Sequence, residues 1–474
     1  MKAQYNQVEK YIITAKCETP LHIGSAVGDK SEVLTHPVEN VPFIQATSLA
    51  GVFRDYYQHT YKESHTEKIF GRSKKNQQED QQEELTGSKI RFSDGAFLDP
   101  EKLVMELRPR VKINAETGTV AAEKVSGTDQ QSGQKFEIEY VAAGAEFRFT
   151  VYLYENDEED DKNFKKCLAE IQQSNLQFGG QKSNGCGYLS IEEVLYKKFD
   201  LTKEEDRNKW FQEDCLEYKD ILEDNEYKDI LKGDEYKAIQ AKISKNFSYD
   251  IKITAKTDGE LLVKGIAVTD LSDNAPDAMN IQNGAGEYII PASSLKGAIR
   301  NRMEMIVAYK GIEKKIIDSI FGKAPNLRKD EEGTKGIISF HDTVIGKQED
   351  NDNAANRIRI QIDKFTGGVM NTGLFNQKYA SGNLTMDIRI SKDEKNPYAN
   401  IACGLLVLAL RDMANGQVTV GSGYSIGKGF IDIKEIQITN EDGKTCTISF
   451  VNKKIEGEDI LNTCFNALKE EIKK

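Results

Sequence analysis

The sequence predicts an α+β protein built from two tandem repeats of one unit. Seven sequence blocks occur twice in the same order, at offsets of roughly 240–250 residues. Each repeat alternates strand-like and helix-like stretches. The chain has 474 residues, which is too long for one ordinary core, so two or three domains are expected.

The repeated blocks fix the domain limits. The first repeat contains TPLHIGS, VPFIQATSLAGVFRDYY, EKIFG, IRFSDGAFL, RVKINAETGTV, EYVAAGAEFRFTVYL and LQFGGQKSNGCGYLSI. The second contains GELLVKG, YIIPASSLKGAIRNRM, DSIFG, ISFHDTVIG, RIQIDKFTGGV, KYASGNLTMDIRI and VTVGSGYSIGKGFIDI. We expect a first domain over 1–197, a charged helical or disordered linker over 198–247, a second domain over 248–438, and a strand–helix appendix over 439–474.

The elements of each repeat follow one order. KYIITAK and YDIKITAK alternate apolar and polar residues, as half-buried strands do. The helix that follows has an apolar face, with Thr47 and Ser48, or Ser293 and Ser294, where an N-cap belongs. FEIEYVAAGAEFRFTVYLY predicts two strands around a turn, and NFKKCLAEIQQ and IACGLLVLALRDMA predict second helices. This order suggests a ferredoxin-like sandwich with insertions.

The linker carries a short repeat of its own. Tyr218, Tyr227 and Tyr236 recur every nine residues within a strongly charged stretch. The stretch is interpreted either as a plain spacer or as a surface that docks a partner.

Composition narrows the class of protein. The net charge is −12, but the acidic stretches 155–161 and 198–245 carry most of it, so a local basic groove is compatible with the sequence. Seven scattered cysteines without a CxxC pair argue against a disulfide framework or a zinc site. The sequence has no long apolar run and no signal peptide. We therefore expect a cytoplasmic protein without a membrane contact.

One helix start has the features of an anion site. IPASSLKG offers free backbone N–H groups, two hydroxyls and Lys296 at a helix N-terminus. Plain helix capping would explain the same residues. The first repeat has Ala50 in place of the lysine, so its contact to a phosphate should be weaker.

The glycine-rich stretch GSGYSIGKG is not a nucleotide-binding loop. It lacks the Walker A spacing, misses GxGxxG by one residue, and precedes a strand where both motifs need a helix. Glycines before a strand instead allow another backbone, including that of RNA, to approach closely.

Acidic residues are the candidates for chemistry. VTDLSDNAPDAMNIQNGAGEYIIP exposes Asp270, Asp273 and Asp277 between the first strand and first helix of the second repeat. A carboxylate here could hold Mg²⁺ or act on a ribose 2′-OH, or it could be an ordinary loop acid. Histidine has thinner support, because His341 matches Ser93 in the first repeat.

Taken together, PLHIGS, SSLKGAIR, IFG, R-x-x-I-x-x-x-T-G and G-x-G-x-x-x-G-x-G resemble the RAMP superfamily, the repeat-associated RNA-binding proteins of CRISPR systems. The similarity is greatest to backbone subunits of type III effector complexes, of which type III-D includes fused pairs. The resemblance implies RRM-like cores with β-hairpin thumbs from PRVKINAETGTVAAEKV and RIRIQIDKFTGGVMNTGLFNQ. It also implies guide RNA, complementary target RNA and other effector subunits, including a polymerase-like large subunit, as partners.

The resemblance also implies functional residues. An aspartate after the first strand would cut target RNA with Mg²⁺ or another divalent cation, by attack of the 2′-OH on its neighbouring phosphate. Asp277 takes that place, also as metal ligand, with Asp273 in reserve, and Asp29 and Glu32 lie near it in the first repeat. The implied RNA-binding residues are Ser293, Ser294, Lys296, Arg300, Gly421, Gly423, Gly427 and Lys428, with Thr47, Ser48, Arg54, Gly179, Gly180 and Gly185 in the first repeat.

Three other functions stay open at this point. The chain could be a purely structural RNA-binding subunit of the same complex. It could be a CRISPR RNA processing endoribonuclease, which needs a general base such as His341. It could also be an unrelated NTP-dependent enzyme, which the loop spacing disfavours.

Overall fold

The computed structural model describes residues 5–24, 31–71, 87–114, 119–120, 122–124, 131–133, 135–155, 157–213, 218–265, 276–323, 333–346 and 354–473. The chain forms two compact units, each with helices and an antiparallel sheet, so the α+β prediction is confirmed. The first unit holds 1–105, 140–180 and 186–245, and the second holds 106–139, 181–185 and 246–474. Two segments of the first repeat therefore belong to the second unit.

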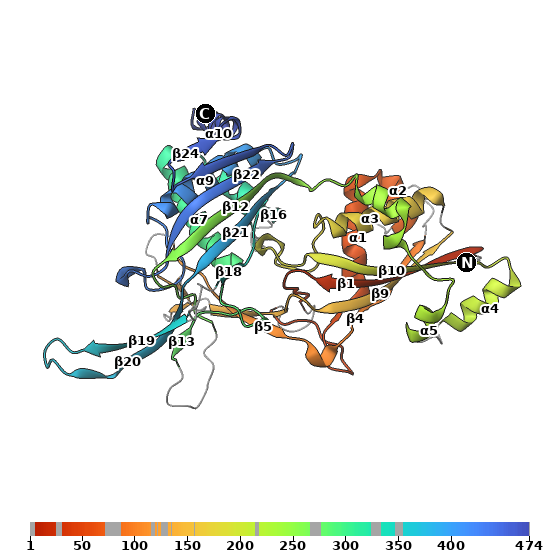
Figure 1. Cartoon of the computed structure of the whole chain (residues 1–474), viewed down its shortest axis with the longest axis horizontal. Coiled ribbons are helices and arrows are strands. Elements are labelled where there is room, and N and C mark those ends of the chain that lie inside the picture. Colours follow the sequence, from red (N-terminus) through yellow and green to blue (C-terminus); the bar gives the residue numbers. More distant parts are fainter. Residues whose placement is uncertain are drawn as a thin grey trace. The chain divides into compact units, whose positions relative to one another are not determined.

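The sheet of the first unit is antiparallel. Its strands lie in the order β11 (Lys228–Asp229), β10 (Leu189–Asp200), β1 (Gln7–Cys17), β9 (Glu146–Tyr154), β4 (Gly95–Phe97) and β2 (Phe43–Ile44), and β3 (Ile90–Phe92) also pairs with β9 (Figure 1). Successive residues of β1 point to opposite faces. Tyr11 and Ile13 enter the main core, whereas Ile12 enters a smaller cluster on the other face.

Two helices cover the main face of this sheet. Helix α1 (Ala46–Thr60), which is followed by α2 (Glu63–Phe70), buries Leu49 and Phe53. Helix α3 (Glu158–Gln172) buries Phe164 and Leu168. Each pair is four residues apart, which places both side chains on one helical face. Burial of each such side chain contributes about 1.5–3 kcal/mol.

The described residues between 198 and 245 form an additional layer of the first unit. Beyond β10 the chain forms α4 (Glu204–Gln212), α5 (Tyr218–Glu223), the 3₁₀ turn η4 (Ile230–Lys232) and α6 (Asp234–Gln240). Tyr227 packs with Ile12 and Leu195 on the outer face of the sheet, and Tyr236 is buried in the main core. Tyr218 packs against the outer cluster. The regular tyrosine spacing thus serves packing within the first unit.

A buried ionic cluster joins this layer to the sheet. The Glu213 carboxylate accepts hydrogen bonds from Lys10 Nζ at 2.8 Å, Lys197 Nζ at 3.2 Å and the Tyr227 hydroxyl at 2.5 Å. The side chains of both lysines are 6% exposed and that of Glu213 is 3% exposed. Charges this deep in the protein are tolerated only when all of them are paired and hydrogen-bonded.

The second unit has a comparable antiparallel sheet. Its order is β14 (Ile289–Ile290), β18 (Thr343–Gly346), β21 (Asn383–Ser391), β12 (Phe247–Asp258), β22 (Phe430–Asn440), β23 (Thr445–Ser449) and β24 (Lys454–Glu456), and β17 (Ile338–Phe340) also pairs with β21. Along β12, buried residues alternate with exposed ones. One face of this sheet therefore meets the core and the other meets solvent.

The helices of the second unit lie on its core face. They are α7 (Ala292–Lys310), α8 (Lys315–Phe321), α9 (Ala399–Ala414) and the C-terminal α10 (Asp459–Ile472). Buried residues of all four enter one cluster with β12, β21 and β22. None of the helices within the described part of the chain is long and apolar enough to span a bilayer.

Small strands complete the structure. They are β5 (Met105–Val111) paired with β8 (Lys135–Val141), β6 (Ala122–Lys124) with β7 (Gln131–Gly133), β15 (Gly322–Lys323) with β16 (Thr334–Lys335), and β13 (Ala278–Met279) beside the hairpin of β19 (Ala354–Ile362) and β20 (Val369–Ala380). The hairpin extends away from the sheet of the second unit (Figure 1).

Replacing Glu213 should destabilise the first unit strongly. Glu213→Ala leaves the buried Lys10 ammonium without its carboxylate, whereas Lys197 keeps Asp224 and Glu226 as partners, and breaking a buried pair in this way costs about 3–5 kcal/mol. Chemical denaturation of the full chain, followed by Trp210 fluorescence, measures this loss. Glu205→Ala removes an exposed partner of Lys209 and serves as the control, with little expected change. Equal stabilities of the two variants would contradict the importance of the cluster.

Candidate nucleic-acid interface

Asp277 lies at the base of the β19–β20 hairpin. Its backbone N–H donates to Asn376 O at 2.7 Å, and its Oδ2 accepts from Asn376 N at 2.7 Å. The next residues form β13, which pairs in parallel with Gln377 and Lys378 of β20. The side chain is exposed. Among the described residues, none bonds to its second oxygen, Oδ1, which is therefore available to a ligand.

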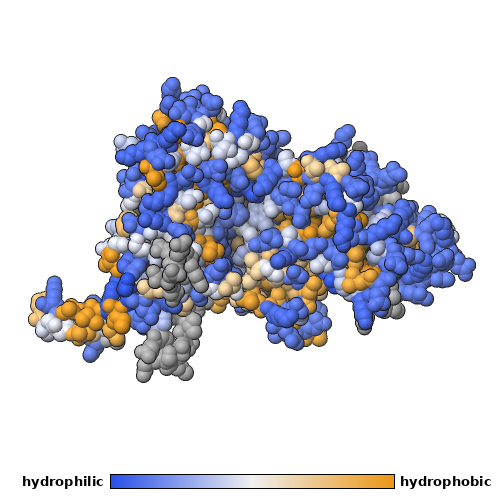
Figure 2. All heavy atoms as spheres, viewed as in Figure 1, coloured by the Kyte–Doolittle hydropathy of each residue, from blue (hydrophilic) through white to orange (hydrophobic). Residues whose placement is uncertain are grey.

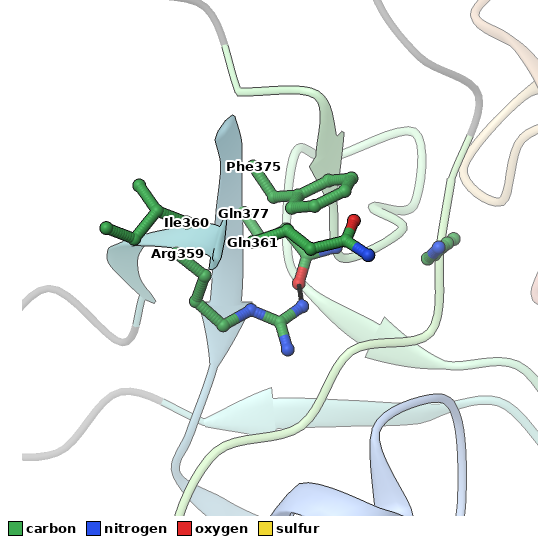
Figure 3. A pocket seen from close by; sticks show the side chains of 6 residues that line it. Arg359, Ile360, Gln361, Phe375 and Gln377 are labelled. Atoms are coloured by element: carbon green, nitrogen blue, oxygen red, sulfur yellow. Dashed lines mark hydrogen bonds between the residues drawn. The ribbon is translucent and has the colours of Figure 1, made fainter. Parts of the chain in front are cut away.

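A pocket of about 360 Å³ lies on the β19–β20 hairpin, to which Asp277 is hydrogen-bonded. It is lined by Lys264, Arg359, Ile360, Gln361, Phe375 and Gln377 (Figure 3). Asn376, the hydrogen-bond partner of Asp277, stands between two of these lining residues. Arg359 donates to the Gln377 side-chain oxygen, which also accepts from the Tyr379 hydroxyl. Two cations, two amides and one aromatic ring suit a nucleotide, because phosphate, base edge and base face each find a partner.

The two faces of the hairpin differ in chemistry. Along β19, Arg357 and Arg359 alternate with Ile358 and Ile360 up to a register shift between Ile360 and Ile362. Opposite them on β20, Leu374 and Val369 continue the aliphatic side. These aliphatic side chains are exposed, and apolar atoms gather visibly over the hairpin (Figure 2).

The glycine-rich loops of the two repeats share one backbone conformation. Each holds a 3₁₀ turn, η2 (Lys182–Asn184) or η5 (Tyr424–Ile426), between two left-handed residues. A Cβ on Gly421 would lie 2.5 Å from Leu262 O, and one on Gly179 would lie 2.2 Å from His22 O. These glycines therefore permit the close approach of the chain's own backbone. Gly427, in contrast, has open space around its Cα.

Lys428, expected to contact RNA, is engaged within the protein. Its ammonium pairs with Glu260, and Arg357 Nε binds the other oxygen of that carboxylate at 2.6 Å. Burial alone would raise the pKa of Glu260, but the hydrogen bonds from these two cations lower it. Glu260 therefore stays charged and orients both cations at the base of the hairpin.

The N-cap prediction for the first helices is wrong. Helix α7 begins at Ala292 after Pro291, and α1 begins at Ala46 after Gln45. In neither helix does the N-cap residue form a side-chain hydrogen bond that caps the helix. A distant aspartate caps each helix instead. Asp342 Oδ1 accepts from Ala292 N at 2.8 Å.

Asp94 makes the equivalent bond to Ala46 N at 2.7 Å. Ser293 and Ser294 thus lie inside the first turn of α7, as Thr47 and Ser48 do in α1.

Lys296 is the most perturbed cation at this helix start. Its Nζ donates to Ser183 Oγ at 2.8 Å, and it makes no ion pair within the described part of the chain. Burial, together with the positive charges of Arg300 and Arg110, lowers the pKa of its ammonium to about 8. Arg300 itself pairs with Glu304 and Asp318. In the first repeat, Arg54 on α1 corresponds to Arg300. The charge of Lys296 therefore lacks a compensating carboxylate and favours an anionic ligand.

The remaining acidic residues that the sequence predicts are Asp29, Asp273 and Glu32. Asp29 and Asp273 lie outside the described residues. Bridges pair Gly24 with Val33 and Lys264 with Asn280, so Val33 corresponds to Asn280. When the two repeats are aligned by these bridges, Glu32 of the first repeat corresponds to Met279 of the second. The residue of the first repeat that corresponds to Asp277 is Lys30.

Asp277 is the protein residue that would bind a metal ion at this site. Within the described part of the chain, no cluster of three or more His, Cys, Asp or Glu side chains could hold a metal. A single carboxylate together with RNA phosphates nevertheless fits Mg²⁺, which keeps several waters and uses few protein ligands.

Comparison with known proteins identifies the family. A family model described as the RAMP superfamily matches residues 14–190 and 243–432, well over half of the chain. The chain belongs to the RAMP superfamily. No curated protein matches it. Among solved structures it is similar to a chain of the type III-B Cmr-beta complex bound to cognate target RNA, with 15% identity and a TM-score of 0.30. That alignment covers 40% of this chain and 61% of the other.

Sequence reasoning missed several residues of this candidate interface. Lys264, Arg359 and Phe375 line the pocket, and Asp94 and Asp342 cap the helices. The repeated dipeptides SD (93–94) and HD (341–342) at one place in both repeats were an available signal for the caps.

The loop glycines should differ in their tolerance of a side chain. Gly427→Ala meets only the left-handed backbone penalty, about 1–2 kcal/mol. Gly421→Ala adds a clash with Leu262 O and should lose clearly more stability. Thermal unfolding of both variants measures the difference. Equal losses would show that the loop does not press on the backbone as described.

Proposed function

We propose that this RAMP protein is a backbone subunit of a type III CRISPR interference complex. It would bind guide RNA and complementary target RNA, and its second repeat would cut the target. The observation that carries the proposal is the position of Asp277, fixed by two backbone hydrogen bonds to β20, a strand that also helps to line a pocket with two cations and an aromatic ring. Family membership supports the RNA-binding part.

We infer a ferredoxin-like core in each unit. The strands of the first unit lie in the order β10–β1–β9–β4 and those of the second in the order β22–β12–β21–β18. Both equal the fourth–first–third–second order of a βαββαβ core. The β19–β20 hairpin would then be the thumb of the second repeat, and its exposed aliphatic face would lie against bases of the guide–target duplex.

The proposed reaction needs little from the protein beyond position and charge. The 2′-OH of a target ribose attacks its phosphate, so that a P–O2′ bond forms as the P–O5′ bond breaks. Asp277 accepts the 2′-OH proton, and the leaving 5′ oxygen takes a proton from water. Lys264 and Arg359 hold the phosphate, while Phe375 stacks on a base. A divalent cation bound by Asp277 and RNA phosphates would neutralise charge at phosphorus.

The processing nuclease is the weaker alternative. Burial and the nearby Arg389 lower the pKa of His341 to about 4, so it is neutral at physiological pH. Gly185 also packs against it, since a Cβ there would lie 2.9 Å from His341 Nδ1. A histidine enclosed in this way has no room for a substrate phosphate.

Removing the Asp277 carboxylate should abolish cleavage without loss of binding. In the assembled complex with guide RNA and Mg²⁺, Asp277→Asn should slow target cleavage by about 100-fold or more, because a positioned base contributes that much. Gel analysis of labelled target measures the rate. Asp258→Asn, an exposed aspartate on β12, is the matched control. Undiminished cleavage by Asp277→Asn would leave only the structural RNA-binding role.

RNA affinity should depend on pH through Lys296. The ammonium is charged below its pKa of about 8 and neutral above it, so its contribution to phosphate binding is lost as pH rises through this value. Filter binding of guide RNA over this range should show a fall in affinity. The fall should be absent in Lys296→Arg, which stays charged, and in Lys296→Met, which never is. The same fall in all three proteins would exclude Lys296 as its source.

A further inference from the structure

Three side chains of the second repeat are joined by hydrogen bonds in a group here called the Tyr379–Gln377–Arg359 triplet. The Tyr379 hydroxyl donates to Gln377 Oε1 at 2.6 Å. Arg359 Nη2 donates to the same oxygen, as Figure 3 shows. Tyr379 is 2% exposed and Gln377 is 8% exposed, whereas Arg359 is an exposed residue. The triplet therefore runs from the interior of the protein to the pocket on the β19–β20 hairpin.

The two donors fix the orientation of the Gln377 amide. A guanidinium can only donate hydrogen bonds, so the oxygen of the amide, and not its NH₂ group, must face Arg359. Tyr379 holds that oxygen from the buried side. Because the acceptor is itself fixed, the Arg359 guanidinium has a defined direction although its side chain is long and exposed. A group held in this way loses little further freedom when a ligand binds.

Gln377 lies on the middle strand at the base of the hairpin, because β20 runs between β13 and β19. On one side Arg357 lies opposite it, and Arg359 reaches it diagonally from the same strand, β19. On the other side it pairs with Ala278 of β13. Asp277, the proposed base, directly precedes Ala278 and is hydrogen-bonded to β20. In the order of the strands, one amide thus stands between the aspartate and the arginine.

The first repeat has the same arginine and tyrosine but not the glutamine. By the repeated sequence blocks, Arg110 corresponds to the arginine of the triplet. By the bridges of Leu21 and Leu261, Tyr140 corresponds to its tyrosine and is also buried. The residue at the place of the glutamine is Ile138. Isoleucine cannot accept a hydrogen bond, so the first repeat cannot form this triplet.

The arginine of the first repeat has a different partner. Arg110 Nη1 donates to Gln181 Oε1 at 2.8 Å, and Gln181 belongs to the loop 181–185 rather than to a hairpin strand. The first repeat also has Lys30 at the place of Asp277. The arginine is therefore held by a strand amide in the repeat that has the aspartate, and by a loop amide in the repeat that lacks it.

We propose that Gln377 is a positioning residue for target RNA cleavage. It holds the Arg359 guanidinium toward the phosphate that the 2′-OH attacks, and Tyr379 fixes the amide that does so. Donors that are oriented in advance stabilise the charge that develops on phosphate oxygens, because they need not reorganise during the reaction. The inference rests on the proposed function and adds to it a residue that acts through Arg359.

The proposal separates the rate of cleavage from the affinity for target RNA. Variants of Gln377 and Tyr379 keep the positive charge of Arg359, so binding of the target should change little. The rate at saturating target should fall instead, since a misplaced donor stabilises the transition state less well than the bound substrate. A merely structural defect would lower binding and cleavage together.

Single-turnover cleavage by the assembled complex with guide RNA and Mg²⁺ tests the proposal. Gln377→Ile, which copies the first repeat, should slow cleavage at saturating target about 10-fold or more, and Tyr379→Phe should slow it by a smaller factor. Tyr140→Phe makes the same change at the corresponding buried tyrosine of the first repeat and is the matched control, with an unchanged rate. Cleavage at the wild-type rate by Gln377→Ile would overturn the proposal.

A double-variant cycle tests whether Gln377 acts through Arg359. Arg359→Ala alone should slow cleavage, and adding Gln377→Ile should cause no further loss, because the interaction is already absent. Equal losses in the presence and absence of Arg359 would overturn the proposal. If Gln377→Ile does not assemble with guide RNA, Tyr379→Phe replaces it in the same cycle with the same criterion.

Asp277→Asn distinguishes failure of this inference from failure of the proposed function. If Asp277→Asn abolishes cleavage while the Gln377 and Tyr379 variants cleave normally, the proposed function stands and the role of Gln377 is excluded. If the wild-type complex does not cleave, or Asp277→Asn cleaves at the wild-type rate, both are overturned.

Discussion

The Asp342 carboxylate joins three elements of the second unit. One oxygen caps the first N–H of α7, and the other binds Arg108, which also pairs with Glu106 on the same strand. Charge-assisted bonds of this kind are short and directional, and a carboxylate at a helix N-terminus also interacts favourably with the helix dipole. Asp342 thus ties β5 to the start of α7, where Lys296 also meets the loop 181–185. Asp94 provides the same cap in the first unit.

In the proposed function, the candidate interface would hold an RNA strand by charge and shape rather than by sequence. Its cations, glycine loops and hairpin offer contacts to phosphates and base faces, whereas few groups are placed to distinguish one base from another. This suits a protein that must accept any guide. Glu260 has a supporting part, because it orients Arg357 and Lys428 toward the base of the hairpin. Asp277 differs from these residues in that main-chain bonds fix its position.

The periodicity of the sequence predicts most of the strands and helices, but it does not predict the contacts that hold them together. The duplicated blocks and the alternation of apolar residues locate the strands and helices because these patterns are local. The helix caps come from residues about fifty positions away, Asp342 for Ala292 and Asp94 for Ala46, so no local spacing could reveal them. The glycine loops were interpreted as surfaces for another backbone, and at Gly421 that backbone is the chain's own. The pocket on the β19–β20 hairpin also includes Lys264, which lies about a hundred residues earlier in the chain, so it likewise has no complete local signature.

The division of the first repeat between the two units has a consequence for synthesis of the chain. Residues 106–139 and 181–185 belong to the second unit, so they emerge from the ribosome long before Asp342 and α7 exist. The first unit in turn needs residues up to 245 to cover its outer sheet face and enclose Glu213. During translation the chain must therefore hold a charged strand with Glu106 and Arg108 in solvent while the first unit closes around it. Their polar character keeps this waiting strand hydrated, and it docks only once the second unit has formed.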